Sequence, residues 1–257
     1  MSTRGWILSA SAFIGLLALG ASAGAETSAA RHVRRAPPPA EPVVVELFTA
    51  QGCSGCPEAN AMVETVAAET GVIALTYPVD YWDYLGWQDT FARPEFTARQ
   101  RAYRQALKLR AVSTPQVIVD GHRQLTGARA PELEVVIAEE TSRRGWPPEI
   151  EFRESGDRVG IGSGRPPRGG AEVVMVTYQR GPQTVTVGSG DNRGQAVRHV
   201  NVVRDIKTLG DWTGRPLLLA LPQAREPADG IVVMIQSKLD RRILNAATLA
   251  QPEDQTP

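Results

Sequence analysis

Residues 46–60 read ELFTAQGCSGCPEAN and contain both cysteines of the 257-residue chain, Cys53 and Cys56. The run VVVELF at residues 43–48 is apolar and rich in β-branched side chains, which predicts a buried central strand. Residues 57–70 begin with proline and repeat apolar side chains at helical spacing, which predicts a helix. The Cys-X-X-Cys motif is therefore predicted to lie between a strand and the beginning of a helix.

This position favours redox chemistry at the two thiols. The unpaired N–H groups and partial positive charge of a helix N-terminus stabilise a thiolate, and a thiol with a lowered pKa is a good nucleophile and leaving group. We predict Cys53 at the exposed end of the turn as the nucleophile. Cys56 would be more deeply buried, one helical turn later, and would act as the resolving cysteine. Together they are the predicted catalytic residues.

Two other uses of the cysteine pair stay open. A structural staple closing so short a loop would contribute only about 2 kcal/mol to stability, which is a weak reason for the pair to exist. Two thiolates could also hold Cu(I), whereas tetrahedral Zn²⁺ would need four ligands and the three histidines are far apart in the sequence. We expect no metal site and no cofactor.

The N-terminal sequence predicts export. Arg4 precedes a stretch of apolar and small residues without charge, and the runs ASA and AGA offer cleavage points, so residues 1–25 are predicted to be a signal peptide. Residues 26–42 would be a flexible, proline-rich leader, and residues 251–257 a disordered tail. We expect a periplasmic or secreted protein without a membrane span in the mature chain, in a compartment where disulfides persist. The balance of 28 basic and 28 acidic residues gives no indication of nucleic-acid binding.

The remaining pattern predicts two domains. Up to residue 144 the expected order is β-α-β-α-β-β-α, and it includes a hairpin turn at Asp120-Gly121. After the sequence GWPP at residues 145–148, only short alternating runs follow, which are typical of an antiparallel sandwich. We therefore predict an α/β domain at residues 43–146 and an all-β domain at residues 147–250.

Other polar and aromatic residues are candidates for supporting roles. Glu46 lies in the apolar strand and is a possible proton relay for Cys56, although a salt bridge is an alternative explanation. The segment DYWDYLGWQD at residues 80–89 could supply a wall of a peptide-binding cleft, or it could be a local aromatic cluster. The side chains concerned are Tyr81, Trp82 and Trp87.

A basic helical segment follows the aromatic one. Its cations are predicted to lie on a solvated helix face. They are Arg99, Arg101, Arg104, Lys108 and Arg110.

The predicted element order, the strand–CXXC–helix junction and Thr114-Pro115 just before a strand resemble the thioredoxin fold. In that family the corresponding proline is cis, lies against the cysteines and exposes backbone that pairs with substrate. The resemblance therefore implies that Thr114 and Pro115 position substrate. This sequence differs from thioredoxin in having no tryptophan before the cysteines, and in having Pro57 where thioredoxin has a basic residue.

A closer resemblance covers roughly residues 43–250. Four stretches are similar to a family of predicted secreted bacterial proteins known only as a domain of unknown function: VVELFTAQGCSGCPEAN, PVDYWDYLGWQDTFA, VSTPQVIVDG and, in the second half, RHVNVVRDIKTLGDW. The layout also resembles outer-membrane lipoproteins that join a thioredoxin-like domain to an immunoglobulin-like one.

These patterns predict thiol–disulfide exchange with the thiols or disulfides of other exported proteins, and a redox partner protein that recharges the cysteine pair. The alternative is a non-enzymatic binding module or a Cu(I)-handling protein on the same scaffold.

Overall fold

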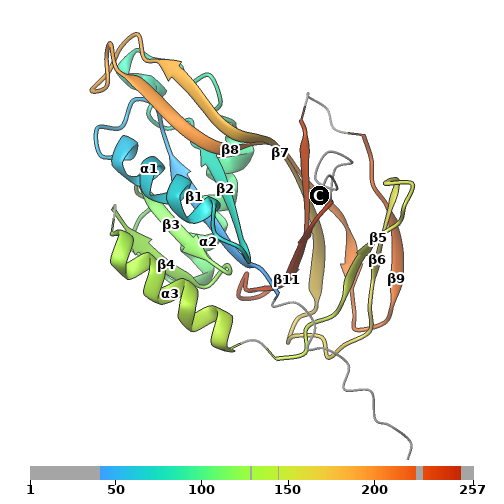
Figure 1. The fold of residues 1–257 in the computed structure, drawn as a ribbon. Helices are drawn as coiled ribbons and strands as arrows, with labels where there is room; N and C mark the ends of the chain where they lie inside the picture. Colours follow the sequence, from blue (N-terminus) through green and yellow to red (C-terminus); the bar gives the residue numbers. More distant parts are fainter. Residues whose placement is uncertain (1–40, 128, 144, 224–227, 250–257) are drawn as a thin grey trace, which may run out of the picture. The chain divides into compact units, whose positions relative to one another are not determined.

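The computed structural model describes residues 41–127, 129–143, 145–223 and 228–249 (Figure 1). The predicted signal peptide, nearly all of the leader and the tail lie outside these residues. The helices are α1 (Cys56–Ala67), α2 (Pro94–Ala106) and α3 (Ala130–Arg143), together with the short 3-10 helix η1 (Asp83–Leu85). The strands of the first half are β1 (Val43–Thr49), β2 (Val72–Pro78), β3 (Gln116–Val119) and β4 (Arg123–Thr126). Those of the second half are β5 (Ile150–Phe152), β6 (Arg158–Ile161), β7 (Ala171–Thr186), β8 (Ala196–Trp212), β9 (Leu217–Ala220), β10 (Gly230–Ser237) and β11 (Ile243–Thr248).

One mixed sheet of eight strands runs through both halves, in the order β11-β10-β7-β8-β2-β1-β3-β4. β1 and β2 are parallel, β3 and β4 continue antiparallel, and β8 pairs with β2 in parallel through Thr76 and Val202. The Thr76 hydroxyl also donates a hydrogen bond of 2.5 Å to the Val200 carbonyl. The predicted boundary near residue 147 therefore does not separate two independent sheets. A strand pairing that joins distant parts of the chain leaves no local sequence pattern.

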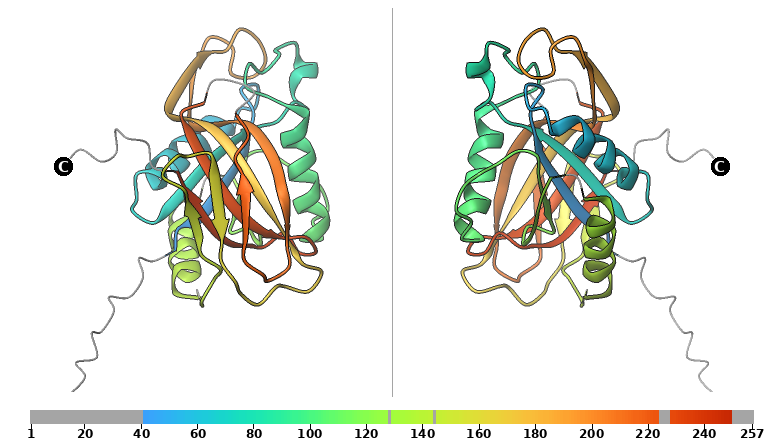
Figure 2. Two further views of the ribbon diagram at one scale, coloured as in Figure 1. Left: turned by 90° about the vertical axis from the view of Figure 1, so that its right-hand side faces the viewer. Right: turned by 90° about the vertical axis from the view of Figure 1, so that its left-hand side faces the viewer.

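Helices cover both faces of the β1–β4 part of the sheet. Alternate residues of β1 point to opposite faces. Val43, Val45 and Leu47 pack in one cluster with the apolar sides of α1 and α3. Val44 and Phe48 pack in another cluster with α2 (Figure 2). The apolar run of β1 is thus explained by burial on both sides.

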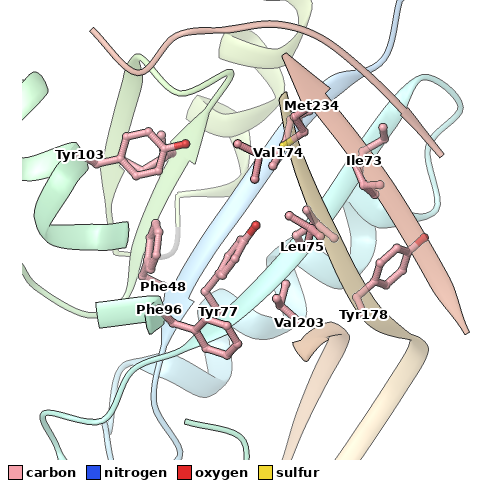
Figure 3. Packing of buried hydrophobic residues seen from close by; sticks show 14 of the residues in the cluster. Phe48, Ile73, Leu75, Tyr77, Phe96, Tyr103, Val174, Tyr178, Val203 and Met234 are labelled. Atoms are coloured by element: carbon pink, nitrogen blue, oxygen red, sulfur yellow. The ribbon is translucent and has the colours of Figure 1, made fainter. Parts of the chain in front are cut away.

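The cluster around α2, which we call the central core, joins the two halves of the chain. Figure 3 shows aromatic and aliphatic side chains from β1, β2 and α2 beside side chains from β7, β8 and β10. Phe48 stacks on Tyr77, and Phe96 meets Tyr77 edge-on. Val174 and Met234, from the second half, belong to the same cluster. The hydrophobic interior is therefore shared rather than divided between two domains.

The predicted antiparallel layers of the second half are present, but one of them is the shared sheet. A three-stranded sheet in the order β5-β6-β9 is the second layer. Val159 and Ile161 of β6 pack with Val173 of β7, Val233 of β10 and the fully buried Trp212. β7 and β10 therefore contact the central core with one face and this small sheet with the other.

The predicted hairpin turn between β3 and β4 is confirmed. Asp120 and Gly121 have φ values of 44° and 72°, as the tight turn requires. A Cβ atom on Gly121 would lie 2.1 Å from the Arg241 carbonyl oxygen, so only glycine fits there. The Ile243 N–H donates to the Asp120 carbonyl at 2.9 Å, which ties this turn to β11.

Candidate functional site

Cys53 and Cys56 form a disulfide at the junction between β1 and α1. The turn is closed by two backbone hydrogen bonds, from the Cys53 N–H to the Ala50 carbonyl at 3.2 Å and from the Cys56 N–H to the Cys53 carbonyl at 3.1 Å. α1 begins at Cys56 with a proline in its first turn. The predicted strand–CXXC–helix junction is therefore present, with the disulfide at the positive end of the helix dipole.

Both cysteines are buried, and the prediction of an exposed Cys53 was wrong. Cys53 is 2% exposed and Cys56 is fully buried. The motif and its flanking strand do not account for this burial. Three segments that are distant in the sequence pack around the CXXC turn: residues 114–115, residues 80–92, and the end of the β7–β8 hairpin.

The first covering segment contains Thr114 and Pro115. The peptide bond between them is cis, as predicted. A Cβ atom on Gly55, between the cysteines, would lie 3.6 Å from the Pro115 Cδ atom, so the proline ring borders the CXXC turn. The Trp82 indole N–H donates to the Thr114 hydroxyl at 2.7 Å. The structure thus brings Thr114, Pro115 and Trp82 to the cysteine pair.

The second covering segment, residues 80–92, binds both the side chain and the backbone of Gln51, two residues before Cys53. The Trp87 indole donates to the Gln51 side-chain oxygen at 2.8 Å, and the Gln51 N–H donates to a carboxylate oxygen of Asp89 at 2.7 Å. Trp82 and Trp87 are half-buried and border the turn, and both Tyr81 and Trp82 pack against the central core. The aromatic segment therefore acts as a brace for the CXXC turn.

Asp89 was not singled out from the sequence. Burial raises its pKa to about 6, although hydrogen bonds from the Gln51 and Phe91 N–H groups oppose the shift. A carboxyl group that titrates near neutrality thus lies against the backbone two residues before Cys53.

The third covering segment is the end of the β7–β8 hairpin, residues 187–195, which we call the hairpin tip. Its Asn192 side chain is 1% exposed and donates hydrogen bonds of 2.8 Å to the carbonyls of both Gln51 and Cys53. No sequence signal connects Asn192 with residues so far away, because the connection depends on how the long hairpin packs.

Glu46 occupies a buried polar network on the central-core face of β1. Its carboxylate accepts a hydrogen bond of 2.7 Å from Arg99 and another from the Tyr103 hydroxyl. Arg99 also donates to Gln236 of β10 at 3.1 Å. Arg99 is 6% exposed, so the prediction that it lies on a solvated helix face was wrong. The salt bridge foreseen as the alternative for Glu46 is present, and both of its carboxylate oxygens have partners other than the cysteines.

Two further observations bear on the kind of site. In the described part of the chain, no three His, Cys, Asp or Glu side chains form a group that could hold a metal ion. The helices described there are too short or too polar to cross a membrane.

Known proteins are similar to this chain over most of its length. The chain aligns with a crystal structure of protein AGR_C_4864 from Agrobacterium tumefaciens with 33% identity and a TM-score of 0.69, covering 84% of this chain and 96% of that one. It is also similar in fold to HBP35 of Porphyromonas gingivalis, with 15% identity and a TM-score of 0.53, covering 84% of this chain and 76% of that one. No curated protein sequence matches the chain. The model of DUF1223, described as a protein of unknown function, matches residues 44–236, and the chain therefore belongs to this family.

Proposed function

We propose that this protein is an exported thiol–disulfide exchange protein that acts on the thiols or disulfides of other exported proteins through Cys53 and Cys56. The observation that carries the proposal is the disulfide between residues three apart at the N-terminus of α1. At that position the helix dipole stabilises a Cys53 thiolate and therefore the reduced form of the pair. A disulfide closing so short a loop gains little from chain entropy. Both effects favour reversible exchange over a permanent staple.

The strand arrangement of the first half supports the same proposal. The strand order β2-β1-β3-β4, with β2 parallel and β3 antiparallel to β1, is compatible with the resemblance to the thioredoxin fold that the sequence motifs suggest. The proline ring borders the CXXC turn, and this supports a role of Thr114 and Pro115 in aligning an extended substrate segment beside the sulfurs.

The exchange step is balanced in both directions. In reduction, the Cys53 thiolate attacks a substrate disulfide, a Cys53–substrate disulfide forms, and one substrate thiolate leaves. The Cys56 thiolate then attacks the Cys53 sulfur, which breaks the mixed disulfide, releases the second substrate thiolate and leaves Cys53 and Cys56 oxidised. A dithiol partner protein must then reduce the pair again. Oxidation of a substrate dithiol follows the same steps in reverse and needs a disulfide partner.

Equilibration against glutathione redox buffers, with the fraction of oxidised protein read from alkylation mass, tests the chemistry. We expect a reduction potential between about −270 and −120 mV, the range of working exchange catalysts, and catalysed reduction or oxidation of a model protein. A pair that stays oxidised below about −300 mV, or a protein without turnover, would show a structural disulfide instead.

Trapping identifies the class of substrate. A Cys56→Ser variant cannot resolve the mixed disulfide, so exported proteins should accumulate on Cys53 and be released by reductant. The Cys53→Ser/Cys56→Ser double variant is the control and should retain none of them. Cell fractionation of the full chain tests the exported location.

A non-enzymatic binding module is the second candidate, and the burial of both cysteines favours it. This alternative predicts that folded protein binds partners equally well with both cysteines replaced by serine. Under the exchange proposal, capture depends on Cys53.

A further inference from the structure

The hairpin tip is a compact unit packed over the CXXC turn. Within the tip, the Gly194 N–H donates to the Val187 carbonyl at 2.7 Å, and the Val187 N–H donates to the Gln195 carbonyl at 2.9 Å. Figures 1 and 2 show this end of β7 and β8 beside the segment that joins β2 to α2. The tip is therefore an ordered element that reaches from the second half of the chain to the cysteine pair of the first.

Backbone contacts bring the tip close to the turn. Gly190 has a φ of 80°, and a Cβ atom on it would lie 3.7 Å from the Gly52 Cα atom. A Cβ atom on Gly188 would lie 2.6 Å from the Trp87 ring, which leaves no room for a larger residue. The tip thus packs on the residue before Cys53 and on the aromatic brace.

The side chain of Asn192 holds the tip to the CXXC turn through hydrogen bonds. Its buried amide nitrogen is shared between the carbonyls of Gln51 and Cys53. These two carbonyls flank the backbone of the cysteine that the proposed exchange needs as nucleophile. If the tip moves away, the bonds from Asn192 to the backbone of the CXXC turn are lost.

We propose that the hairpin tip is a cap on the redox pair, held closed by Asn192, and that a reactant reaches Cys53 only after the cap opens. This inference rests on the proposed exchange function and adds its control of access. Asn192 is a positioning residue in this scheme, since it holds the cap and takes no part in the exchange of electrons. The cap would select substrates whose polypeptide chain can displace residues 187–195 from the CXXC turn.

Reduction of the oxidised full-length protein by dithiothreitol tests the cap without needing a protein substrate. A dithiothreitol thiolate attacks the Cys53 sulfur and displaces the Cys56 thiolate. The second thiol of the reagent then closes its ring, releases Cys53 and leaves oxidised dithiothreitol. At high dithiothreitol concentration attack on the open state becomes faster than closing, so the rate in the wild type should level off at the rate of opening. A rate that stays proportional to the reagent concentration and is also unchanged by the substitutions below would overturn the cap.

Substitutions test which residue holds it. Asn192→Ala should be reduced about tenfold faster than the wild type at one fixed reagent concentration, because two buried hydrogen bonds of the closed state are lost. Gly188→Ala should also be reduced faster, since its new methyl group displaces the tip from Trp87 without touching Asn192. Arg193→Ala is the matched control, because Arg193 is an exposed residue of the same tip, and it should react at the wild-type rate.

Thermal unfolding of each oxidised variant distinguishes easier access of dithiothreitol to Cys53 from a general loss of stability. Faster reduction with a melting temperature near that of the wild type supports the cap. Equal rates in folded Asn192→Ala, folded Gly188→Ala and the wild type overturn it. Failure of the exchange proposal gives a different result. In that case the wild type has no turnover with protein substrates, although Asn192→Ala is reduced faster by dithiothreitol.

Discussion

At the scale of single residues, buried titratable groups surround the site. His199 of β8 is fully buried, and neither ring nitrogen has a hydrogen-bond partner of normal geometry among the described residues. Its ring meets Phe91 edge-on with 5.7 Å between the ring centroids. Phe91 lies two residues after Asp89, in the segment that packs around the CXXC turn. Burial lowers the pKa of His199 to about 4, from an ordinary value of 6.5. The histidine is therefore neutral in the folded protein at neutral pH.

We predict that His199 makes the fold sensitive to acid. Between pH 6.5 and about 4 the unfolded chain binds a proton at this histidine and the folded chain does not, so stability falls as the pH falls through this window. The total loss should be about 3 kcal/mol. A His199→Phe variant should lack this loss, so urea unfolding curves at pH 7 and pH 4 should show its stability improving relative to the wild type as the pH falls.

The comparison isolates His199 because both chains contain Asp89, whose raised pKa acts in the opposite direction. Between its ordinary value of 3.8 and about 6, the folded chain holds the Asp89 proton more tightly, so this carboxyl group adds stability as the pH falls. His122→Gln, at a half-buried histidine paired with Glu140, is the control and should keep the acid-dependent loss of the wild type. If the free energy of unfolding of His199→Phe falls between pH 7 and pH 4 by as much as that of the wild type, the prediction is contradicted.

At the scale of elements, α2 is a polar helix that supplies one wall of the central core. Its buried residues recur at helical spacing; they are Phe96, Thr97, Arg99, Gln100 and Tyr103. The guanidinium of Arg99 lies 5.1 Å from the centre of the Tyr103 ring and reaches Glu46 of β1 and Gln236 of β10. A buried charged group thus connects three elements where an apolar one would be expected.

We predict that Arg99→Ala destabilises the fold by about 3–5 kcal/mol, because it leaves the Glu46 carboxylate buried without its cation. Arg101→Ala, at an exposed position of the same helix, should change stability by less than about 0.5 kcal/mol. Urea unfolding at pH 7 measures both. The double change Glu46→Gln with Arg99→Met should cost less than Arg99→Ala alone, since it removes both charges. A small effect of Arg99→Ala would show that water or another cation can replace the guanidinium.

At the scale of the described chain, the two halves share a sheet, a core and the site itself. The Asn201 side chain of β8 donates to the Ala74 carbonyl of β2 at 3.0 Å, and the Asn60 amide of α1 donates to the Arg198 carbonyl at 2.9 Å. The hairpin tip adds the bonds of Asn192 to the CXXC turn. Each connection joins residues from opposite sides of position 147.

We predict that a fragment ending at residue 147 does not fold by itself, whereas the chain without its predicted signal peptide unfolds in one cooperative transition. The fragment would expose the central-core side of β1, β2 and α2, which the second half covers in the complete fold. Circular dichroism during thermal unfolding and the dispersion of amide NMR signals measure this. A fragment with a sharp transition of its own would show that residues 43–146 are an independent domain.

The sequence by itself was sufficient for the elements of the first half and for the position of the cysteine pair. The apolar run before Cys53, the proline after Cys56 and the Asp120-Gly121 turn are local signals, since each acts on its own stretch of backbone. They correctly placed β1, α1, the β3–β4 turn and the disulfide at the strand–helix junction.

The tertiary structure decided how this site is enclosed. Pairing of β8 with β2, burial of Arg99 against Glu46 and closure of the turn by Asn192 all join residues that are far apart in the chain. Hydrogen bonds and burial depend on distance in space, and a long antiparallel hairpin such as β7–β8 brings its tip to whatever surface the sheet pairing presents. The motif therefore predicted the disulfide, whereas the packing of three distant segments around the turn determined that Cys53 is buried.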